Sequence, residues 1–306
     1  MSNQEKRNLA ASIHRRLLNK ANESGRPFNE LLQYYAMERF LFRLSRSPHS
    51  KKFVLKGALM LVAWDVSFSR PTSDIDLLGM TDNDVGAIVS ILKDICTMNV
   101  EADGIEFDPG SVAGEVVVEV AEYPGVRARI RANLGTAIIR VQIDVGFGDP
   151  IVPGPRMFDY PALLDMPAPR LKGYSRESVV AEKLESIARF GILNSRLKDF
   201  FDIWLLARQF DFDGETLHAA VDKTFSNRAR PVNAEIIVQM KAYADDDKRS
   251  VQWRAFCRKN KLTSVPLDLL EVVESIVEFI KPIVAAVSEG EPIPDKWHAP
   301  GPWQRE

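Results

Sequence analysis

The chain has 306 residues, which at roughly 150 residues per domain suggests two domains or one domain with a large appendage. Hydrophobic residues make up 45% and charged residues 27%, a globular balance that excludes global disorder and a small disulfide scaffold. Lys and Arg number 40 against 42 Asp and Glu, a formal charge of -2. Any nucleic-acid surface would therefore be a local patch.

Cysteines and histidines are few and scattered. Cys96 and Cys257 form no CxxC motif, so the pattern does not favour a zinc site and fits a reducing cytoplasm. The first residues are polar, and no run of about 18 uncharged apolar residues occurs. We expect a soluble cytoplasmic protein with no membrane partner.

The N-terminal region has the apolar spacing of helices. From Leu9 to Leu44 the pattern is broken only at residues 23–27, which predicts two helices, the second with Asn29 as its N-cap. We expect residues 1–50 to form a helical N-terminal flank.

Residues 51–150 change to a mixed pattern. A strand at 53–55 ends at Gly57 and leads into a helix, a second strand follows at 75–78, and a helix at 84–98. Three further strands are expected at 115–122, 126–134 and 136–145. This region therefore predicts a mixed α/β core.

Helical patterns dominate beyond the prolines that follow residue 150. We expect a helical C-terminal domain over residues 151–290, whose segment 272–287 is amphipathic. Residues 291–306 have no periodicity and predict an extended tail. The fold class is thus α+β (α/β), with a mixed sheet flanked by helical parts.

Two carboxylates lie close together in the second expected strand. Asp74 and Asp76 are two residues apart, so their side chains share one face of the strand. Their charges repel unless a cation lies between them, and Mg²⁺ is the usual one. The alternative is a pair of solvated turn residues.

Two more features extend this pattern. Gly57 precedes a helix whose first N–H groups favour a phosphate. Asp144 lies between apolar residues of a strand and should have a cation as its neighbour. If its strand is beside that of Asp74 and Asp76, three carboxylates converge on a site of the two-metal kind.

A second polar group is expected in the helical region. Arg196, Asp199 and Asp202 recur at helical spacing, and Lys183 lies among apolar residues of the preceding helix. These residues either form a buried ion-pair network or bind a ligand.

Three arginines alternate along one strand. Arg127, Arg129 and Arg131 share a face, which is either solvated or an RNA-binding track. A further basic cluster contains Arg43, Arg46, Lys51 and Lys52.

The motifs together resemble a known family. Lys56-Gly57, the run from Arg70 to Asp76, Glu182-Lys183 and the run from Arg196 to Asp202 are similar to the nucleotidyltransferase AbiEii/AbiGii toxin family of the DNA polymerase β-like superfamily. The similarity extends from about residue 28 to about residue 210. Ala58 replaces the family's Ser or Gly, so phosphate contacts would depend on backbone amides or on Thr72 and Ser73.

The resemblance implies an enzyme of the nucleotidyltransferase fold that uses two Mg²⁺ ions to transfer NMP from an NTP to RNA, such as the 3′ end of tRNA. It makes Asp74, Asp76 and Asp144 metal ligands and, with Lys183 and Asp199, the catalytic set. The implied NTP-binding residues are Lys56, Gly57, Arg70, Thr72, Ser73, Lys183 and Arg196.

The resemblance also implies a toxin of a toxin–antitoxin or phage-defence system, with a cognate antitoxin as partner. Two alternatives stay open. Acidic residues with metal ions also hydrolyse phosphodiesters in nucleases, and the chain could be a silent module that binds nucleotide or RNA.

Overall fold

The computed structural model describes residues 2–64, 70–117, 124–191 and 196–304. The chain forms two compact units. The first contains residues 1–148 and 156–173, and the second contains residues 149–155 and 174–306.

The first unit begins with two helices, α1 (Asn3–Ser24) and α2 (Phe28–Arg46). Ser2 and Glu5 form a capping box that starts α1. The predicted N-cap at Asn29 is wrong. The backbone N–H groups of Glu30 and Leu31 donate to the carbonyl of Pro27, so the helix begins one residue before Asn29.

A mixed seven-stranded sheet forms the body of this unit, in the order β3-β4-β5-β2-β1-β7-β6. The strands are β1 (Phe53–Lys56), β2 (Asp74–Gly79), β3 (Ile105–Val117), β4 (Gly125–Leu134), β5 (Ala137–Phe147), β6 (Arg156–Asp159) and β7 (Arg170–Gly173). The pairs β2–β5 and β1–β7 are parallel, and the other pairs are antiparallel. The predicted α/β class, with its mixed sheet, is confirmed.

Two strand predictions need correction. β3 starts at Ile105 instead of Glu115, because Pro109 and Gly110 lie where the register with β4 shifts between Asp108 and Ala113, and such a bulge hides the alternation. Residues 118–122 of that prediction lie outside the described part. Residues 156–173, expected in the helical C-terminal domain, contribute β6 and β7 to this sheet.

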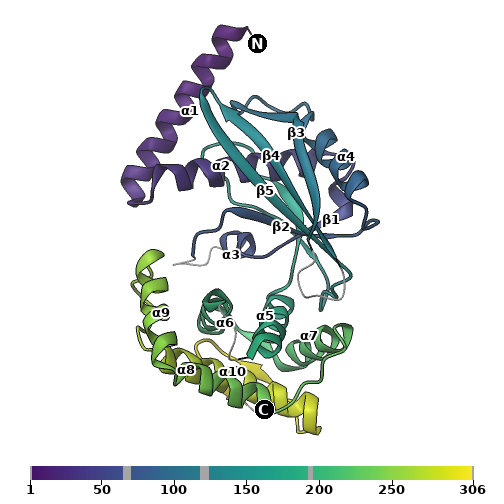
Figure 1. Cartoon of the computed structure of the whole chain (residues 1–306), viewed down its shortest axis with the longest axis vertical. Helices are drawn as coiled ribbons and strands as arrows, with labels where there is room; N and C mark the ends of the chain where they lie inside the picture. The colour runs from purple at the N-terminus through teal and green to yellow at the C-terminus, as the bar shows by residue number, and fades with distance from the viewer. Residues whose placement is uncertain (1, 65–69, 118–123, 192–195, 305–306) are drawn as a thin grey trace. The chain divides into compact units, whose positions relative to one another are not determined.

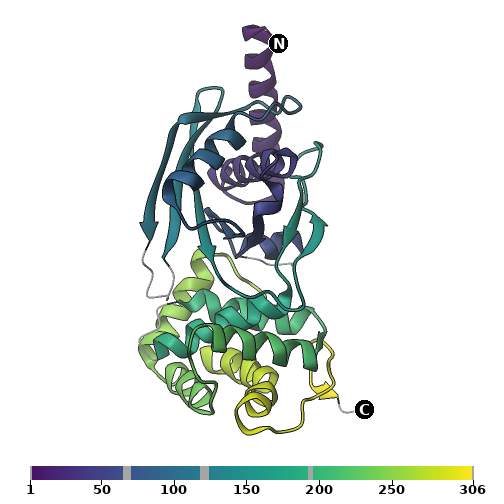
Figure 2. The same cartoon turned by 90° about the vertical axis from the view of Figure 1, so that its right-hand side faces the viewer.

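Helices cover the apolar side of the sheet. α2 contacts β5 and β7, and α4 (Val85–Cys96) packs on β3 and β4; Figure 2 shows α2 end-on between these strands. Along the chain, the short helix η1 (Ser50–Lys52) precedes β1 and the short helix α3 (Leu59–Ala63) follows it. Figure 1 shows the long strands β3, β4 and β5 side by side.

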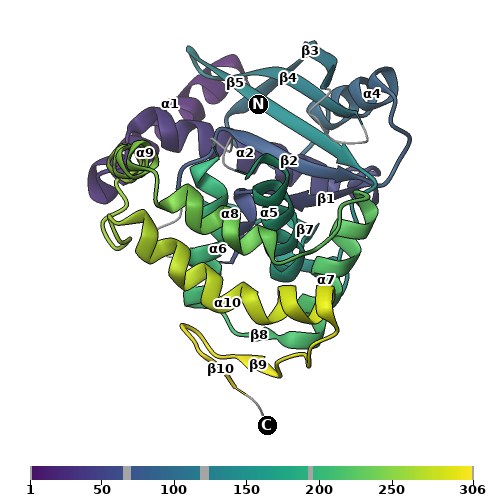
Figure 3. The same cartoon turned by 60° about the horizontal axis from the view of Figure 1, so that its bottom comes forward.

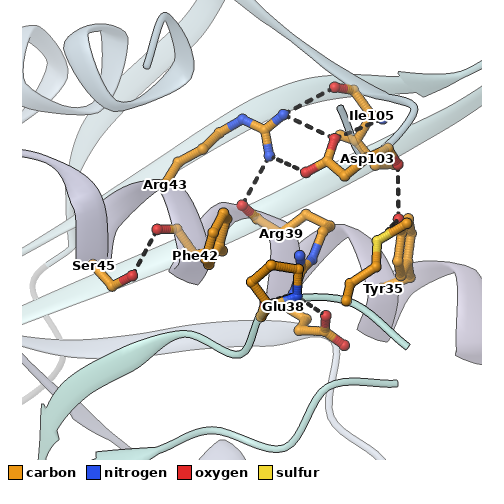
Figure 4. A network of polar contacts seen from close by, with 10 residues as sticks. Tyr35, Glu38, Arg39, Phe42, Arg43, Ser45, Asp103 and Ile105 are labelled. Atoms are coloured by element: carbon orange, nitrogen blue, oxygen red, sulfur yellow. Dashed lines mark hydrogen bonds and ion pairs between the residues drawn. The ribbon is translucent and has the colours of Figure 1, made fainter. Parts of the chain in front are cut away.

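A buried polar network joins α2 to the segments around it (Figure 4). The Arg43 guanidinium donates to both carboxylate oxygens of Asp103, at 2.6 and 3.0 Å, and to the Ile105 carbonyl. Glu38 pairs with Arg39 and accepts from the Leu163 amide at 2.6 Å. Burial raises the pKa of Glu38. Arg43 is therefore part of the core, and the prediction that it belongs to a basic surface cluster is wrong.

The second unit is mainly helical. Its helices are α5 (Arg176–Phe190), α6 (Leu197–Gln209), α7 (Gly214–Asn227), α8 (Glu235–Ala244), α9 (Asp247–Lys259) and α10 (Leu269–Glu289). The expected amphipathic segment 272–287 lies in α10, which buries an apolar face against α6, α7 and α8.

The C-terminal residues, expected as an extended tail, contribute two short strands to a small sheet. β8 (Phe212–Asp213), β9 (Lys296–Trp297) and β10 (Trp303–Gln304) are antiparallel, and Figure 3 shows them beside α10. Trp297 is fully buried and donates to the Ala207 carbonyl at 2.6 Å. No helix in the described ranges is both long and apolar enough to cross a membrane.

Candidate functional site

Asp74 and Asp76 open strand β2. The strand alternates, with Ile75 and Leu77 buried and both aspartates half-buried. A strand places every second side chain on the same face. The two carboxylates therefore lie on the polar face of the sheet, as the sequence predicts.

Asp144 is on the neighbouring strand. β2 and β5 pair in parallel with Asp76 opposite Asp144 and Asp74 opposite Gln142. Ile143 and Val145 are buried, so Asp144 extends from the same polar face as Asp76. The condition stated from the sequence is therefore met: the strand of Asp144 is beside the strand of Asp74 and Asp76.

Gly57 lies directly against Asp76. Its φ is +70°, and a β-carbon at this position would be 1.9 Å from Asp76 Oδ2. Lys56 is opposite Asp76 in the β1–β2 pair. Only a residue without a side chain permits this approach. The helix that follows, α3, has five residues, so the dipole expected there is that of little more than one turn.

The segment before β2 is fixed by α2. Gln33 Nε2 donates to the carbonyls of Ser73 at 3.2 Å and Arg140 at 3.0 Å. The Thr72 amide donates to the Tyr34 hydroxyl at 3.1 Å. Ser73 Oγ donates to Asp74 Oδ1 at 3.0 Å. Gln33 and Tyr34 thus hold the start of β2 beside β5, and no motif in the sequence indicated them.

Asp144 has the cationic neighbour that the sequence predicts, and that neighbour is an arginine. Arg127 Nε donates to Asp144 Oδ1 and Arg127 Nη2 donates to Asp144 Oδ2, both at 2.8 Å. Gln142 Nε2 donates to Asp144 Oδ2 at 3.3 Å. Arg127 is opposite Asp144 in the β4–β5 pair, so the sheet itself sets this contact.

The other two arginines of β4 also have acidic partners. Arg129 pairs with Glu115 at 2.9 Å, and Arg131 pairs with Asp108. The hydrogen bond from Arg131 lowers the pKa of Asp108. All three arginines share a face as predicted, but each one faces a carboxylate. Their role as an RNA-binding track stays a prediction.

Lys183 lies between two buried carboxylates in the second unit. Its Nζ is 3.1 Å from Asp199 Oδ1 and 2.6 Å from Asp202 Oδ2. Ser186 Oγ donates to Asp199 Oδ2 at 3.1 Å. The structure brings Lys183 together with Asp199 and Asp202, two of the residues whose helical spacing predicted either a buried ion-pair network or a ligand site.

Two remaining candidates have local roles. Arg70 is buried at the start of the segment that leads into β2. Arg196 precedes α6, and its guanidinium carbon is 5.1 Å from the centre of the Phe190 ring. Their predicted contacts with NTP stay predictions.

The aspartates on the sheet suit a hard divalent cation in their chemistry. Carboxylate oxygens are the ligands that Mg²⁺ prefers, and Gly57 leaves the space that the Asp76 carboxylate occupies. Within the described segments, however, no three His, Cys, Asp or Glu side chains form a group that could hold an ion. The carboxylate oxygens of Asp74, Asp76 and Asp144 are of the type that Mg²⁺ binds. Those of Asp144 accept hydrogen bonds from Arg127.

Comparisons with known proteins give one family match and two similar solved structures. The family model described as nucleotidyl transferase AbiEii toxin, Type IV TA system, matches residues 39–275. No curated protein matches the chain. Two solved structures are similar: JHP933 from Helicobacter pylori (13% identity, TM-score 0.48, 82% of this chain and 93% of that one), and a protein described as "putative nucleotidyltransferase from H. pylori" (14%, 0.47, 86% and 97%).

Proposed function

Because the chain belongs to the AbiEii family of nucleotidyl transferase toxins, we propose that it transfers NMP from an NTP to an RNA acceptor with Mg²⁺ bound at Asp74, Asp76 and Asp144. The observation that carries the proposal is the facing pair Asp76 and Asp144 on parallel strands, with Asp74 on the same face. Growth arrest, an antitoxin partner and a cytoplasmic location follow from the family.

The chemistry divides among these residues. Bound Mg²⁺ would supply Lewis-acid polarisation of the α-phosphate. Asp74 and Asp76 provide carboxylate oxygens, and Asp144 takes the proton of the acceptor hydroxyl. The hydroxyl oxygen then bonds to the α-phosphorus as the bond to the leaving pyrophosphate breaks, so that charge and atoms balance.

Cationic groups are needed because negative charge grows on the leaving pyrophosphate. Lys56 is opposite Asp76 in the β1–β2 pair, which supports a role beside the phosphates. The backbone at Gly57, with the hydroxyls of Thr72 and Ser73, would bind phosphate oxygens. The roles of Arg70, Lys183, Asp199 and Arg196 rest on the family motif alone.

The second substrate is the acceptor of the NMP. We propose RNA, with the 3′ end of tRNA as the first candidate, because the family motif implies it. The test is to incubate the purified protein with total RNA and each labelled NTP, with Mg²⁺ or with EDTA. Transfer predicts label in RNA from at least one NTP and none with EDTA.

Two results would reject the proposal. Shortened RNA without any need for NTP would identify a metal-dependent nuclease. Nucleotide or RNA binding without any covalent product, for every NTP and with tRNA supplied, would identify a silent binding module. Asp94→Asn is the matched control for Asp76→Asn, because it removes one carboxylate charge elsewhere. Asp94 is exposed on α4 and pairs with His49 at 3.1 Å.

A further inference from the structure

Both carboxylate oxygens of Asp144 are engaged by neighbouring side chains. Both of its oxygens accept hydrogen bonds from the Arg127 guanidinium at 2.8 Å, and Oδ2 also accepts one from Gln142. The side chain of Asp144 is 26% exposed and that of Arg127 is 29% exposed. A bidentate, charge-assisted pair of this kind is among the stronger polar contacts in proteins.

The sheet register places this pair beside Asp76. Arg127 is opposite Asp144 across β4–β5, and Asp144 is opposite Asp76 across β5–β2. With Lys56 opposite Asp76 across β1–β2, the row carries the charges plus, minus, minus, plus, and Arg127 is the cation on the Asp144 side. In that row the guanidinium offsets part of the repulsion between the two neighbouring carboxylates.

We infer that Arg127 is the internal counter-cation of Asp144 within the aspartate set. It holds Asp144 in the metal-free protein, and a divalent cation gains Asp144 as a ligand only by displacing the guanidinium. The inference rests on the proposed function, because it assigns the cation to Asp74, Asp76 and Asp144.

The physical reason is competition for one carboxylate. A dication beside Asp144 and the Arg127 guanidinium would repel each other at short distance, so the two compete for the Asp144 oxygens. Arg127 therefore weakens metal binding while it stabilises the metal-free sheet. If Arg127 only belonged to a solvated face or only bound RNA, its replacement would not change the affinity for the metal ion.

The test is the affinity of the purified full chain for Mn²⁺ alone, measured by calorimetry and by electron paramagnetic resonance without NTP or RNA. For Arg127→Met we expect a Kd about tenfold lower, since the bidentate pair no longer has to be broken. Arg127→Lys keeps the charge and loses the planar fork, so its Kd should fall between the two.

The matched control is Arg140→Gln. Arg140 is exposed on β5 and four residues before Asp144, so this variant removes the same charge from the same strand without touching the pair. Its Kd for Mn²⁺ should stay within about a factor of two of the wild type, as expected for an exposed, screened charge. Adding Asp144→Asn to Arg127→Met should cancel the gain, because the ligand itself is then removed.

The outcomes separate the inference from the proposed function. An unchanged or higher Kd in Arg127→Met overturns the inference, while loss of Mn²⁺ binding in Asp76→Asn still supports the proposed metal site. An equal gain in Arg140→Gln also overturns it, since a general charge effect would then suffice. Failure of the wild type and of folded Arg127→Met to bind Mn²⁺ overturns both.

Discussion

The carboxylate of Asp76 lies against Gly57 so closely that a β-carbon on the glycine would be 1.9 Å from Asp76 Oδ2. The glycine is also in the left-handed region, with φ of +70°. The turn after β1 therefore fixes where the Asp76 carboxylate can be, and the first prediction tests this dependence.

Gly57→Ala should abolish nucleotidyl transfer by pushing the Asp76 carboxylate aside. The positive φ alone should cost about 1–2 kcal/mol of stability. The measurement is NMP incorporation per folded molecule, with folding checked by thermal unfolding.

Gly25→Ala is the matched control for this change. Gly25 has a similar φ of +65°, and a β-carbon there would meet nothing within 4 Å. It should show the backbone cost in stability and keep full activity. Full activity in folded Gly57→Ala would show that the position of Asp76 does not depend on the glycine.

Lys183→Met should destabilise the protein strongly. It leaves the buried carboxylates of Asp199 and Asp202 without their shared ammonium, and breaking a buried pair costs about 3–5 kcal/mol. Denaturant unfolding measures the loss. Asp202→Asn in the same chain should recover part of it, because one of the two facing charges is then gone.

The activity of the same variant decides the role of Lys183. If the ammonium binds triphosphate, activity per folded molecule should fall as well. A variant that unfolds much earlier and keeps its activity per folded molecule would make Lys183 a structural residue only.

Replacing Arg129 and Arg131 with Ala tests the RNA-binding track. Arg127 stays in place because it holds Asp144. If both arginines exchange their carboxylates for RNA phosphates, the log–log salt slope of RNA binding should flatten by about 1.4, at ~0.7 per phosphate on a single strand.

Arg170→Ala controls for general loss of charge, since Arg170 is exposed on β7. NTP binding should not change in either variant. An unchanged salt slope in the double variant would reject the track. Lys51, Lys52 and Arg46 would then be the next candidates, without the buried Arg43.

Cys96 and Cys257 should be inert in the folded protein. Burial raises the pKa of Cys96 to about 12 and that of Cys257 to about 11, so at pH 8 the reactive thiolate is scarce. An aromatic disulfide reagent should label neither thiol until denaturant is added. Rapid labelling of a native thiol at pH 8 would contradict this burial.

Local patterns in the sequence were enough to predict much of the fold and part of the site. Strands β2, β4 and β5 were predicted because their side chains alternate or their apolar runs are clear, and that alternation put Asp74 and Asp76 on one face. The sequence left open whether the strand of Asp144 is beside theirs, and the β2–β5 register shows that it is.

Contacts between distant segments could not be predicted in this way. The pairing of Arg127 with Asp144 depends on the register of β4 on β5, and the bonds from Gln33 depend on how α2 packs. β6 and β7 are four residues each, too short for a period to stand out among the prolines.

The most direct test of the account is NMP incorporation by Asp76→Asn compared with the wild type, in Mg²⁺, with the NTP and RNA that the wild type uses. The change removes a charge and keeps the volume of the side chain. The account predicts that incorporation is abolished while the cooperative unfolding transition is kept or shifted upward by the relief of repulsion with Asp144. Wild-type incorporation by the folded variant would contradict it.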